Sequence, residues 1–444
     1  MSASSFSLTC GGAPFSFPIP TCGSKPVDFV KIFHSSICST DSYQLIGRLY
    51  NSRKHLVTQL LSSSASLSEK LHSIDDYIQY VVPFFNSMKN QGSVRLDVEM
   101  MFEWTGAFSS DRRIQKFPDI IFEVAMVLHT KAVLHHCLGR QLLYSDPTNN
   151  VAVAGQNFHA ASGIMDYLAS ILLPQWTTTA KRPIETNIMF CRAMREFFTA
   201  EAQQMAVVKE TQKTGGSLSS LMARLCVAAL RATDEGLDHL DKVPKESHIF
   251  PTEVAIFNRT FYASLAYYYS GELARIKEEA AGLALGYYRE SLGRMNELYT
   301  GTKENIDKFN KLTNDSPFMK DGLQYLTSTV KSMQSTVERD NNMIFFQEVP
   351  NYRDLPSLPS GVLVMPTKIY IPPINENIII FTYDEQRKSI ALGTEWSSSS
   401  FGSIVTGIQS DKLTGSMKDN KVSIDADHEF AMALQKKINE GQSI

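Results

Sequence analysis

The stretch ETNIMFCRAMREFFTAEAQQMAVVKETQ, residues 185–212, predicts one long helix at the centre of the fold. Its apolar residues recur at intervals of three and four, which is the spacing of one face of a helix and not of a strand. Phe190, Phe197 and Val208 widen that face beyond a single contact, so we expect neighbouring helices to cover it on two sides. The narrower stripe itself consists of Cys191, Met194, Phe198, Ala202 and Met205.

Helical periodicity continues on both sides of this stretch. Upstream, residues 94–108 begin with strand-like alternation, and the rest of the apolar spacing predicts helices over residues 27–39, 42–63, 66–88, 117–139 and 149–173, with Gly139 as a C-cap. Downstream, the loop Thr-Gly-Gly-Ser precedes predicted helices over 218–240, 257–279 and 280–295 and a last one that ends at Arg339. The pair 257–279 and 280–295 is typical of a tetratricopeptide-like unit, so we expect a mainly α fold, a helical solenoid irregular at both ends.

The composition is that of an ordinary globular protein. The chain has 444 residues, of which 43 % are hydrophobic and 20 % charged, so it is long enough to bury a large core. A net charge of -3 argues against a strong sequence-independent attraction to nucleic acid or anionic lipid. Six scattered cysteines without a CxxC pair indicate a reducing, cytosolic setting.

Membrane and lipid signals are weak in the sequence. No stretch approaches the roughly 18 apolar residues of a membrane span, and the start has no basic segment followed by an apolar run. Residue 2 is Ser and Gly441 stands where a prenylated Cys would have to be, so we expect no myristoyl or prenyl anchor. Any membrane contact is expected to be weak or to come through partners.

Catalytic and metal-binding patterns are also weak. His129 and His136 would share a helix face at about 10 Å, which is beyond the reach of one ion. Cys191 lies in the most buried stripe with no His nearby in sequence, which favours an inert core thiol. The chain contains no P-loop, GxSxG, HExxH or dinucleotide motif. We therefore expect no metal, no cofactor and no enzymatic activity.

Several segments, taken together and in order, resemble the Bro domain of Alix-type ESCRT adaptors, and most closely its short Brox-like members. They are FSFPIP (15–20), FEWTGAF (102–108), FHAASGIMDYL (158–168), AEAQQ (200–204), RDNNMIFFQEVP (339–350) and MPTKIYIPP (365–373). The resemblance covers about residues 15–373. It implies a curved helical solenoid around a tetratricopeptide-like core, with a small strand element near the N-terminus.

The resemblance also implies a partner. Bro domains bind the C-terminal amphipathic helix of an ESCRT-III core subunit of the Snf or Chmp class, which lays apolar side chains into a surface groove. Alix-type members have Phe where this chain has Ala206, and the Gly-Gly loop leaves the register of the next helix open. We therefore predict Leu221 with Leu225 as the main anchors and Leu218 with Met222 as the second choice, and core packing of all four residues stays the alternative. The full predicted groove is Met205, Ala206, Lys209, Leu218, Leu221, Met222 and Leu225.

The chain beyond the last predicted helix is expected to run back over the body. Prolines from Pro350 onward force extended chain, and the apolar run 343–346 just before them is predicted to close the core as a strap. Removing everything after Val337 should then destabilise the domain by several kcal/mol, because large aromatic side chains would lose their burial.

Outside the resemblance, the two ends of the chain are expected to differ from the body. We predict a flexible N-terminus over 1–14, a linker or irregular tail over 374–424 and a short amphipathic helix over 425–441. This helix resembles a ubiquitin-interacting motif, with Lys437 as a departure because the motif has a small Ser there. An unpartnered or intramolecularly docked helix stays the alternative. The residues that the resemblance assigns to ubiquitin are Asp427, Glu429, Phe430, Ala433, Leu434 and Glu440.

These features favour an adaptor of the cytoplasm that is recruited to endosomes or other ESCRT sites. The alternative is a helical-repeat scaffold with an unrelated peptide partner. A pull-down with an ESCRT-III C-terminal helix separates the two.

Overall fold

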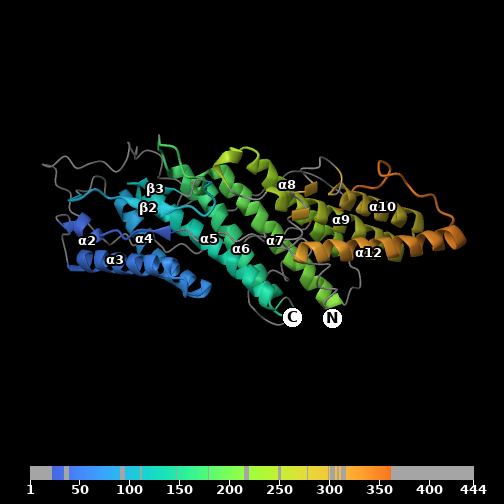
Figure 1. The fold of residues 1–444 in the computed structure, drawn as a ribbon, viewed down its shortest axis with the longest axis horizontal. Helices are drawn as coiled ribbons and strands as arrows, with labels where there is room; N and C mark the ends of the chain where they lie inside the picture. Colours follow the sequence, from blue (N-terminus) through green and yellow to red (C-terminus); the bar gives the residue numbers. More distant parts are fainter. Residues whose placement is uncertain are drawn as a thin grey trace, which may run out of the picture.

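The structure is a computed structural model and shows an elongated stack of helices (Figure 1). It describes residues 23–34, 40–90, 96–110, 113–146, 148–178, 180–214, 220–248, 252–277, 279–298, 300, 306–307, 310–311 and 317–361. The expected flexible N-terminus, the segment FSFPIP, residues 374–424 and the helix over 425–441 lie outside these residues. Within them the chain is mainly α, as the sequence predicts.

A small antiparallel sheet lies at the N-terminal end of the stack. Its strands are β1 (Gly23–Ser24), β2 (Phe102–Thr105) and β3 (Ile114–Phe117), in that order. Gly23 pairs with Thr105, so the start of the described chain is joined to a segment 82 residues later. The helix predicted over 27–39 is shorter than expected. Only α2 (Phe29–Ile32) forms one turn, after which the Ile32 carbonyl accepts a hydrogen bond from the Asp97 amide.

Three long helices continue from the sheet, namely α3 (Thr40–Leu61), α4 (Leu67–Asn90) and α5 (Ile120–Ser145). A buried carboxylate, that of Glu123 on α5, ties them together. Its oxygens accept hydrogen bonds from Arg53 on α3 at 2.9 and 3.1 Å, from Tyr77 on α4 at 3.0 Å and from Trp104 on β2 at 2.6 Å. Since all four side chains are buried, this polar cluster fixes how the first helices meet.

Helix α5 differs from its prediction in two ways. It does not end at Gly139 but runs to Ser145. Gly139 serves instead to admit the Phe158 ring, because a β-carbon at this position would lie 2.7 Å from that ring. By length and composition alone, α5 is also apolar enough to cross a membrane, which the sequence analysis did not expect of any segment. However, 83 % of that apolar window is buried inside the fold, as in the core helix of a globular protein.

The predicted central helix is α7 (Ile188–Thr214), which follows a short turn at Ile184–Thr186. It packs against α6 (Val151–Tyr167) on one side and α8 (Ser220–Leu240) on the other, and all residues of the predicted stripe are buried. A π-helical turn, Leu168–Leu172, extends α6. Among the described residues, α7 joins the apolar cluster of the N-terminal half, through residues such as Phe198, to that of the C-terminal half, through residues such as Ala206.

The C-terminal half contains the predicted helical pair, α9 (Thr252–Lys277) and α10 (Ala281–Glu297), followed by α12 (Pro317–Asp340). Each helix packs on its neighbour in sequence, α8 on α9, α9 on α10 and α10 on α12. Figure 1 shows this order along the long axis, from α3 and α4 at one end to α10 and α12 at the other. This is the one-dimensional arrangement of a helical solenoid.

After α12 come the apolar run 343–346 and an extended segment over 347–361. The sequence predicted the course of the extended segment correctly but not that of the apolar run. A π-helical turn, Asn341–Phe345, leads into what we call the return segment, residues 347–361, which runs back over α10 and reaches α8. Val349, Leu355 and Leu358 of this segment pack against the core, so the expected strap is present.

The apolar run before the return segment does not close the core as predicted. We call residues 343–346 the apolar hook, because their side chains point outward. The exposed fractions are 71 % for Met343, 65 % for Ile344, 44 % for Phe345 and 75 % for Phe346. The reason is local. Asn341 stays buried at the start of the π-helical turn, and residues 343–346, in this turn and just after it, are left exposed.

Candidate functional site

The predicted groove residues lie on the last turns of α7 and the first turns of α8, where the two helices pack together. The structure separates them into two groups. Met205 belongs to a small apolar cluster with α6 residues such as Phe158, which is separate from the cluster that contains Ala206. The residues brought together on the other side are Ala206, Leu221, Met222 and Leu225. Leu218 lies outside the described residues.

Burial distinguishes these residues from an open groove. Leu221 is 9 % exposed and Leu225 1 %, and both pack in the same cluster as Phe257 and Phe261 of α9. Lys209 is half-buried. In the structure as it stands the two leucines are therefore core residues, as the alternative in the sequence analysis allows. Binding of a partner helix by these residues stays a prediction.

The return segment is part of what covers α8 here. Leu221, Leu225 and Ala228 stand at i, i+4 and i+7, so they share one face of the helix. A β-carbon at Gly361 would lie 2.9 Å from the Ala228 amide nitrogen, and the Ser360 carbonyl accepts a hydrogen bond from Arg224 at 3.2 Å. The return segment therefore contacts α8 at one end of the face that carries the predicted anchors.

Two polar side chains of the AEAQQ segment have partners inside the fold. The Tyr262 hydroxyl of α9 donates to Gln204 Oε1 at 2.9 Å, and His136 Nε2 of α5 lies 3.2 and 3.3 Å from the carboxylate oxygens of Glu201. Burial disfavours the charged imidazole, but the Glu201 carboxylate outweighs it and raises the pKa of His136 above its ordinary value. The His136 ring also stacks on Phe198. These residues hold α5, α7 and α9 in register.

The FEWTGAF segment has a similar structural role. Trp104 donates to the buried Glu123, and the amides of Phe108 and Ser109 donate to Glu185 Oε1 at 2.9 and 3.0 Å. Gly106 lies so close to Glu185 that a β-carbon would meet its carboxylate at 2.0 Å, so this position needs glycine. The motif therefore fastens the sheet to the turn that precedes α7.

The residues considered for chemistry are also placed. Cys191 is buried, and burial raises the pKa of its thiol far above the ordinary value, so it is held as an unreactive thiol. His129 packs edge-on against Phe108, away from His136. Among the described residues no group of three or more His, Cys, Asp or Glu side chains has the arrangement to hold a metal ion.

One exposed surface was missed by the sequence reasoning. The apolar hook and the nearby Tyr352, which is 62 % exposed, are large apolar side chains that face outward near the C-terminal end of the described chain. Their apolar character had suggested burial. The sequence did contain a signal. Four consecutive apolar residues fit neither the helical nor the strand period, so they cannot all lie on one buried face and some of them must be exposed. The predicted ubiquitin-binding residues, Asp427, Glu429, Phe430, Ala433, Leu434 and Glu440, lie outside the described residues.

Comparisons with known proteins agree with this architecture. The chain is 21 % identical over 371 residues to the BRO1 domain-containing protein BROX of Homo sapiens, which covers 80 % of this chain and 86 % of that protein. It is 22 % identical over 270 residues to the vacuolar protein-sorting protein bro1 of Schizosaccharomyces pombe, covering 59 % of this chain and 33 % of that protein.

Solved structures share the fold. One, described as an ALIX BRO1 CHMP4C complex, has a TM-score of 0.64 at 14 % identity and covers 84 % of this chain and 100 % of that one. Another, described as the structure basis for endosomal targeting by the Bro1 domain, has a TM-score of 0.58 at 17 % identity and covers 76 % and 88 %. The model of the BRO1-like domain matches residues 18–388, which is most of the chain. The protein therefore belongs to the BRO1-like domain family.

Proposed function

We propose that the protein is a non-enzymatic adaptor that binds the C-terminal amphipathic helix of an ESCRT-III subunit of the Snf or Chmp class. The observation that carries the proposal is family membership over residues 18–388. In addition, the fold matches the whole of the solved chain described as an ALIX BRO1 CHMP4C complex, and 84 % of this protein takes part in the match. An apolar helix needs an apolar surface to bind, and α8 carries the predicted anchors.

The proposed binding site is the face of α8 that carries Leu221 and Leu225. The return segment contacts this face at Ala228 and Arg224, and in this proposal a partner helix takes its place there. Leu221, the more exposed of the two leucines, is then the main anchor. Lys209 of the predicted groove is half-buried on α7.

Calorimetry with the full chain and an ESCRT-III C-terminal helix peptide tests the proposal. We expect saturable binding to the wild type and a loss of about 30-fold or more in Leu221→Asp, because a carboxylate placed against apolar partner residues costs about 2 kcal/mol. Leu230→Asp is the matched control, since Leu230 is a half-buried leucine nine residues further along the same helix. It should keep the affinity.

Two outcomes contradict the proposal at different levels. Wild-type protein that shows no binding at millimolar peptide removes the proposed partner. Equal affinities for the wild type and Leu221→Asp, at unchanged melting temperatures, move the site away from α8. Leu225→Asp is not a useful probe of binding, because Leu225 is buried in the core and its replacement should unfold the protein.

We further propose recruitment to endosomes or other ESCRT sites in the cytoplasm. A relative named as a vacuolar protein-sorting protein and a solved structure described in terms of endosomal targeting support this placement. The tagged chain should accumulate at such sites when ESCRT-III disassembly is blocked, and a Leu221→Asp chain should not. A diffuse distribution of the wild-type chain under that block would count against it.

A further inference from the structure

The apolar hook is the most unusual surface of the described chain. Four consecutive large apolar side chains face outward on one turn, whereas exposed apolar residues on a folded protein are normally scattered. Phe346 adds a second anomaly. Its φ of 54° is the left-handed conformation, which a bulky residue rarely adopts and which persists only where the surroundings enforce it.

The surroundings do enforce it. The Asn341 side chain, which is buried, donates to the Gln347 carbonyl at 2.9 Å and accepts from the Gln347 amide at 3.0 Å. The Phe346 amide donates to the Asn341 carbonyl at 2.7 Å. Gln347 is in turn held by the Glu279 carbonyl at 3.1 Å and the Gly282 amide at 3.0 Å. The hook is thus built in advance of any contact, which lowers the entropy lost on binding.

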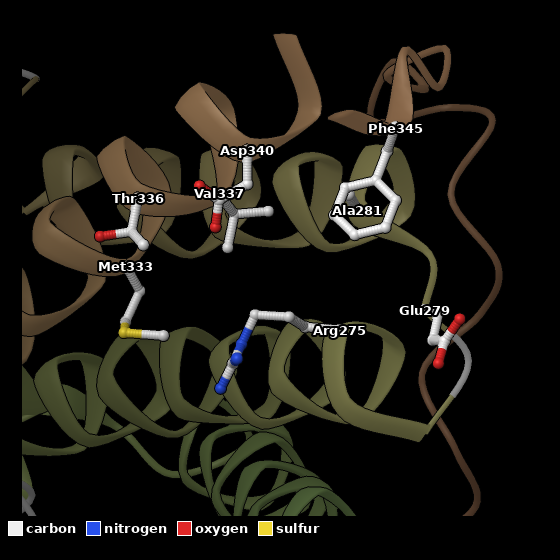
Figure 2. A pocket seen from close by; sticks show the side chains of 8 residues that line it. All are labelled: Arg275, Glu279, Ala281, Met333, Thr336, Val337, Asp340 and Phe345. Atoms are coloured by element: carbon white, nitrogen blue, oxygen red, sulfur yellow. The ribbon is translucent and has the colours of Figure 1, made fainter. Parts of the chain in front are cut away.

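A cavity of about 410 Å³ opens beside the hook, between α9, the start of α10 and α12. Figure 2 shows Val337 and Asp340 of α12 and the ring of Phe345 on one side of it, with Arg275 of α9 across from them. Met333 and Ala281 add further apolar lining. The hook and cavity together therefore offer an apolar surface with charges of both signs at its edge.

The area of the hook alone is smaller than a second copy of the chain would need. Side chains of about 200 Å² each, at the exposures of the hook, present on the order of 500 Å². A stable protein interface needs about 800 Å² from each partner. An occupant the size of one short helix fits this surface better.

The chain itself supplies such a helix. Residues 425–441 carry Phe430, Leu434 and Ile438 at i, i+4 and i+8, which gives an amphipathic helix one narrow apolar stripe that needs a partner. Its start is acidic and its later part contains Lys436 and Lys437. Charged side chains of the cavity, Arg275 and Asp340, are already paired with Glu272 and Arg339, so the apolar stripe is the part of this helix that matches the surface.

The length of the chain also permits this contact. The return segment ends at Gly361 on α8, and α9 and α10 separate α8 from the hook by about two helix diameters, roughly 20 Å. Residues 362–424 supply 63 residues of connection, which at up to about 3.3 Å per residue is more than long enough to span that distance. We propose that residues 425–441 dock as an amphipathic helix on the apolar hook and its cavity.

Hydrogen exchange on the full chain tests the proposal from both sides. Leu434→Asp should release the helix and speed amide exchange at the hook by about tenfold, with a matching rise in the fluorescence of a dye that binds apolar surface. Gln435→Asp, which adds the same charge on another face of the helix, is the control and should change neither signal. Unaltered exchange at the hook in Leu434→Asp would overturn the proposal.

The reverse substitution is Phe345→Asp, at the hook side chain that lines the cavity and is 44 % exposed. It should speed exchange in residues 430–440 about tenfold, whereas Tyr352→Asp, at an exposed aromatic residue off the hook, should not. A labelled peptide of residues 423–444 should bind the Leu434→Asp chain saturably and lose that binding in a Leu434→Asp, Phe345→Asp double variant. Absence of binding would refute the docking.

Two other occupants are distinguishable in the same experiments. If the peptide of residues 423–444 binds ubiquitin, with shifts that Ala433→Arg abolishes, but does not bind the body of the protein, the helix serves ubiquitin and the proposal fails. If the wild-type chain sediments with phosphatidylcholine vesicles through Phe345 while exchange in residues 430–440 is the same in all variants, the hook serves a membrane and the proposal also fails.

Discussion

At the level of single residues, the buried carboxylate of Glu123 governs the N-terminal half. It is paired with Arg53, and Tyr77 and Trp104 supply the remaining hydrogen bonds, so the pair is fully satisfied without water. Such a pair adds little net stability compared with apolar packing, but it is costly to break, because removing one partner leaves an uncompensated charge in the interior.

We expect Arg53→Met to lower the free energy of unfolding by about 3–5 kcal/mol, measured by urea denaturation. Lys131→Met is the matched control. It breaks an ion pair to Asp75, whose side chain is half exposed, and should cost less than about 1 kcal/mol. Combining Arg53→Met with Glu123→Leu should recover part of the loss. Equal effects of the two single changes would show that burial of the pair has no special consequence.

A second prediction for a single residue concerns the loss of stability at acidic pH caused by the buried His129. Burial lowers the pKa of His129 from 6.5 to about 3, and both ring nitrogens are without a hydrogen bond. The unfolded chain therefore binds a proton that the folded chain does not, so this group's contribution to stability is present above pH 6.5 and is lost as the pH falls toward 3. At pH 5 the loss is about 2 kcal/mol.

His129→Leu should remove this loss. The free energy of unfolding of the variant minus that of the wild type should therefore be about 2 kcal/mol larger at pH 5 than at pH 7. His55→Leu, at an exposed position, is the control and should show no such difference. Parallel stability curves for His129→Leu and the wild type across this pH range would contradict the assignment of a neutral, buried imidazole.

At the level of elements, the return segment acts as a clamp over the C-terminal helices. A β-carbon at Gly282 would lie 2.2 Å from the Glu348 carbonyl oxygen, and one at Gly286 would lie 2.8 Å from Leu355. The helix α10 therefore accepts the segment because its contact face carries no side chains at these two positions.

Gly282→Ala should push the segment off α10 and lower the free energy of unfolding by about 1–3 kcal/mol in thermal or chemical denaturation. Gly47→Ala is the opposite control, since nothing lies within 4 Å of a β-carbon there and alanine favours helix by up to about 1 kcal/mol. Truncation after Val337 should also destabilise the domain, now because Val349, Leu355 and Leu358 lose their packing. Equal melting temperatures for Gly282→Ala and Gly47→Ala would refute the clamp.

The same elements show what sequence can and cannot predict. Periodicity predicted α7, α9 and α10 well, because a helix that is buried on two sides repeats its apolar residues regardless of what covers it. Gly139 was misassigned because a glycine that ends a helix and one that admits a neighbouring ring have the same local sequence. The direction of the hook and the burial of Leu225 depend on contacts with distant segments, which no local pattern contains.

At the level of the whole molecule, the helices form a series in which each contacts its neighbours in sequence. The described part of the chain has one large apolar cluster in each half, with α7 between them. In such a series a defect acts mainly on its own neighbourhood, because few contacts bridge distant repeats.

We expect Phe261→Ala, a change in the C-terminal cluster, to cost about 3–5 kcal/mol locally and to speed amide exchange in α8–α10 far more than in α3–α5. Phe84→Ala in the N-terminal cluster is the reciprocal control and should give the reverse pattern. Uniform acceleration along the chain in both variants would instead show one cooperative unit.

The pairing of β1 with β2 has a consequence for synthesis on the ribosome. Gly23 leaves the ribosome 82 residues before its partner Thr105, a delay of about 4–16 s at roughly 5–20 residues per second. The Arg53 guanidinium must wait in the same way for Glu123. In contrast, α9 and α10 follow each other closely and can pair as they emerge. The N-terminal half is therefore translated first but closes late, and during that interval its apolar helices are the part of the nascent chain most in need of a chaperone.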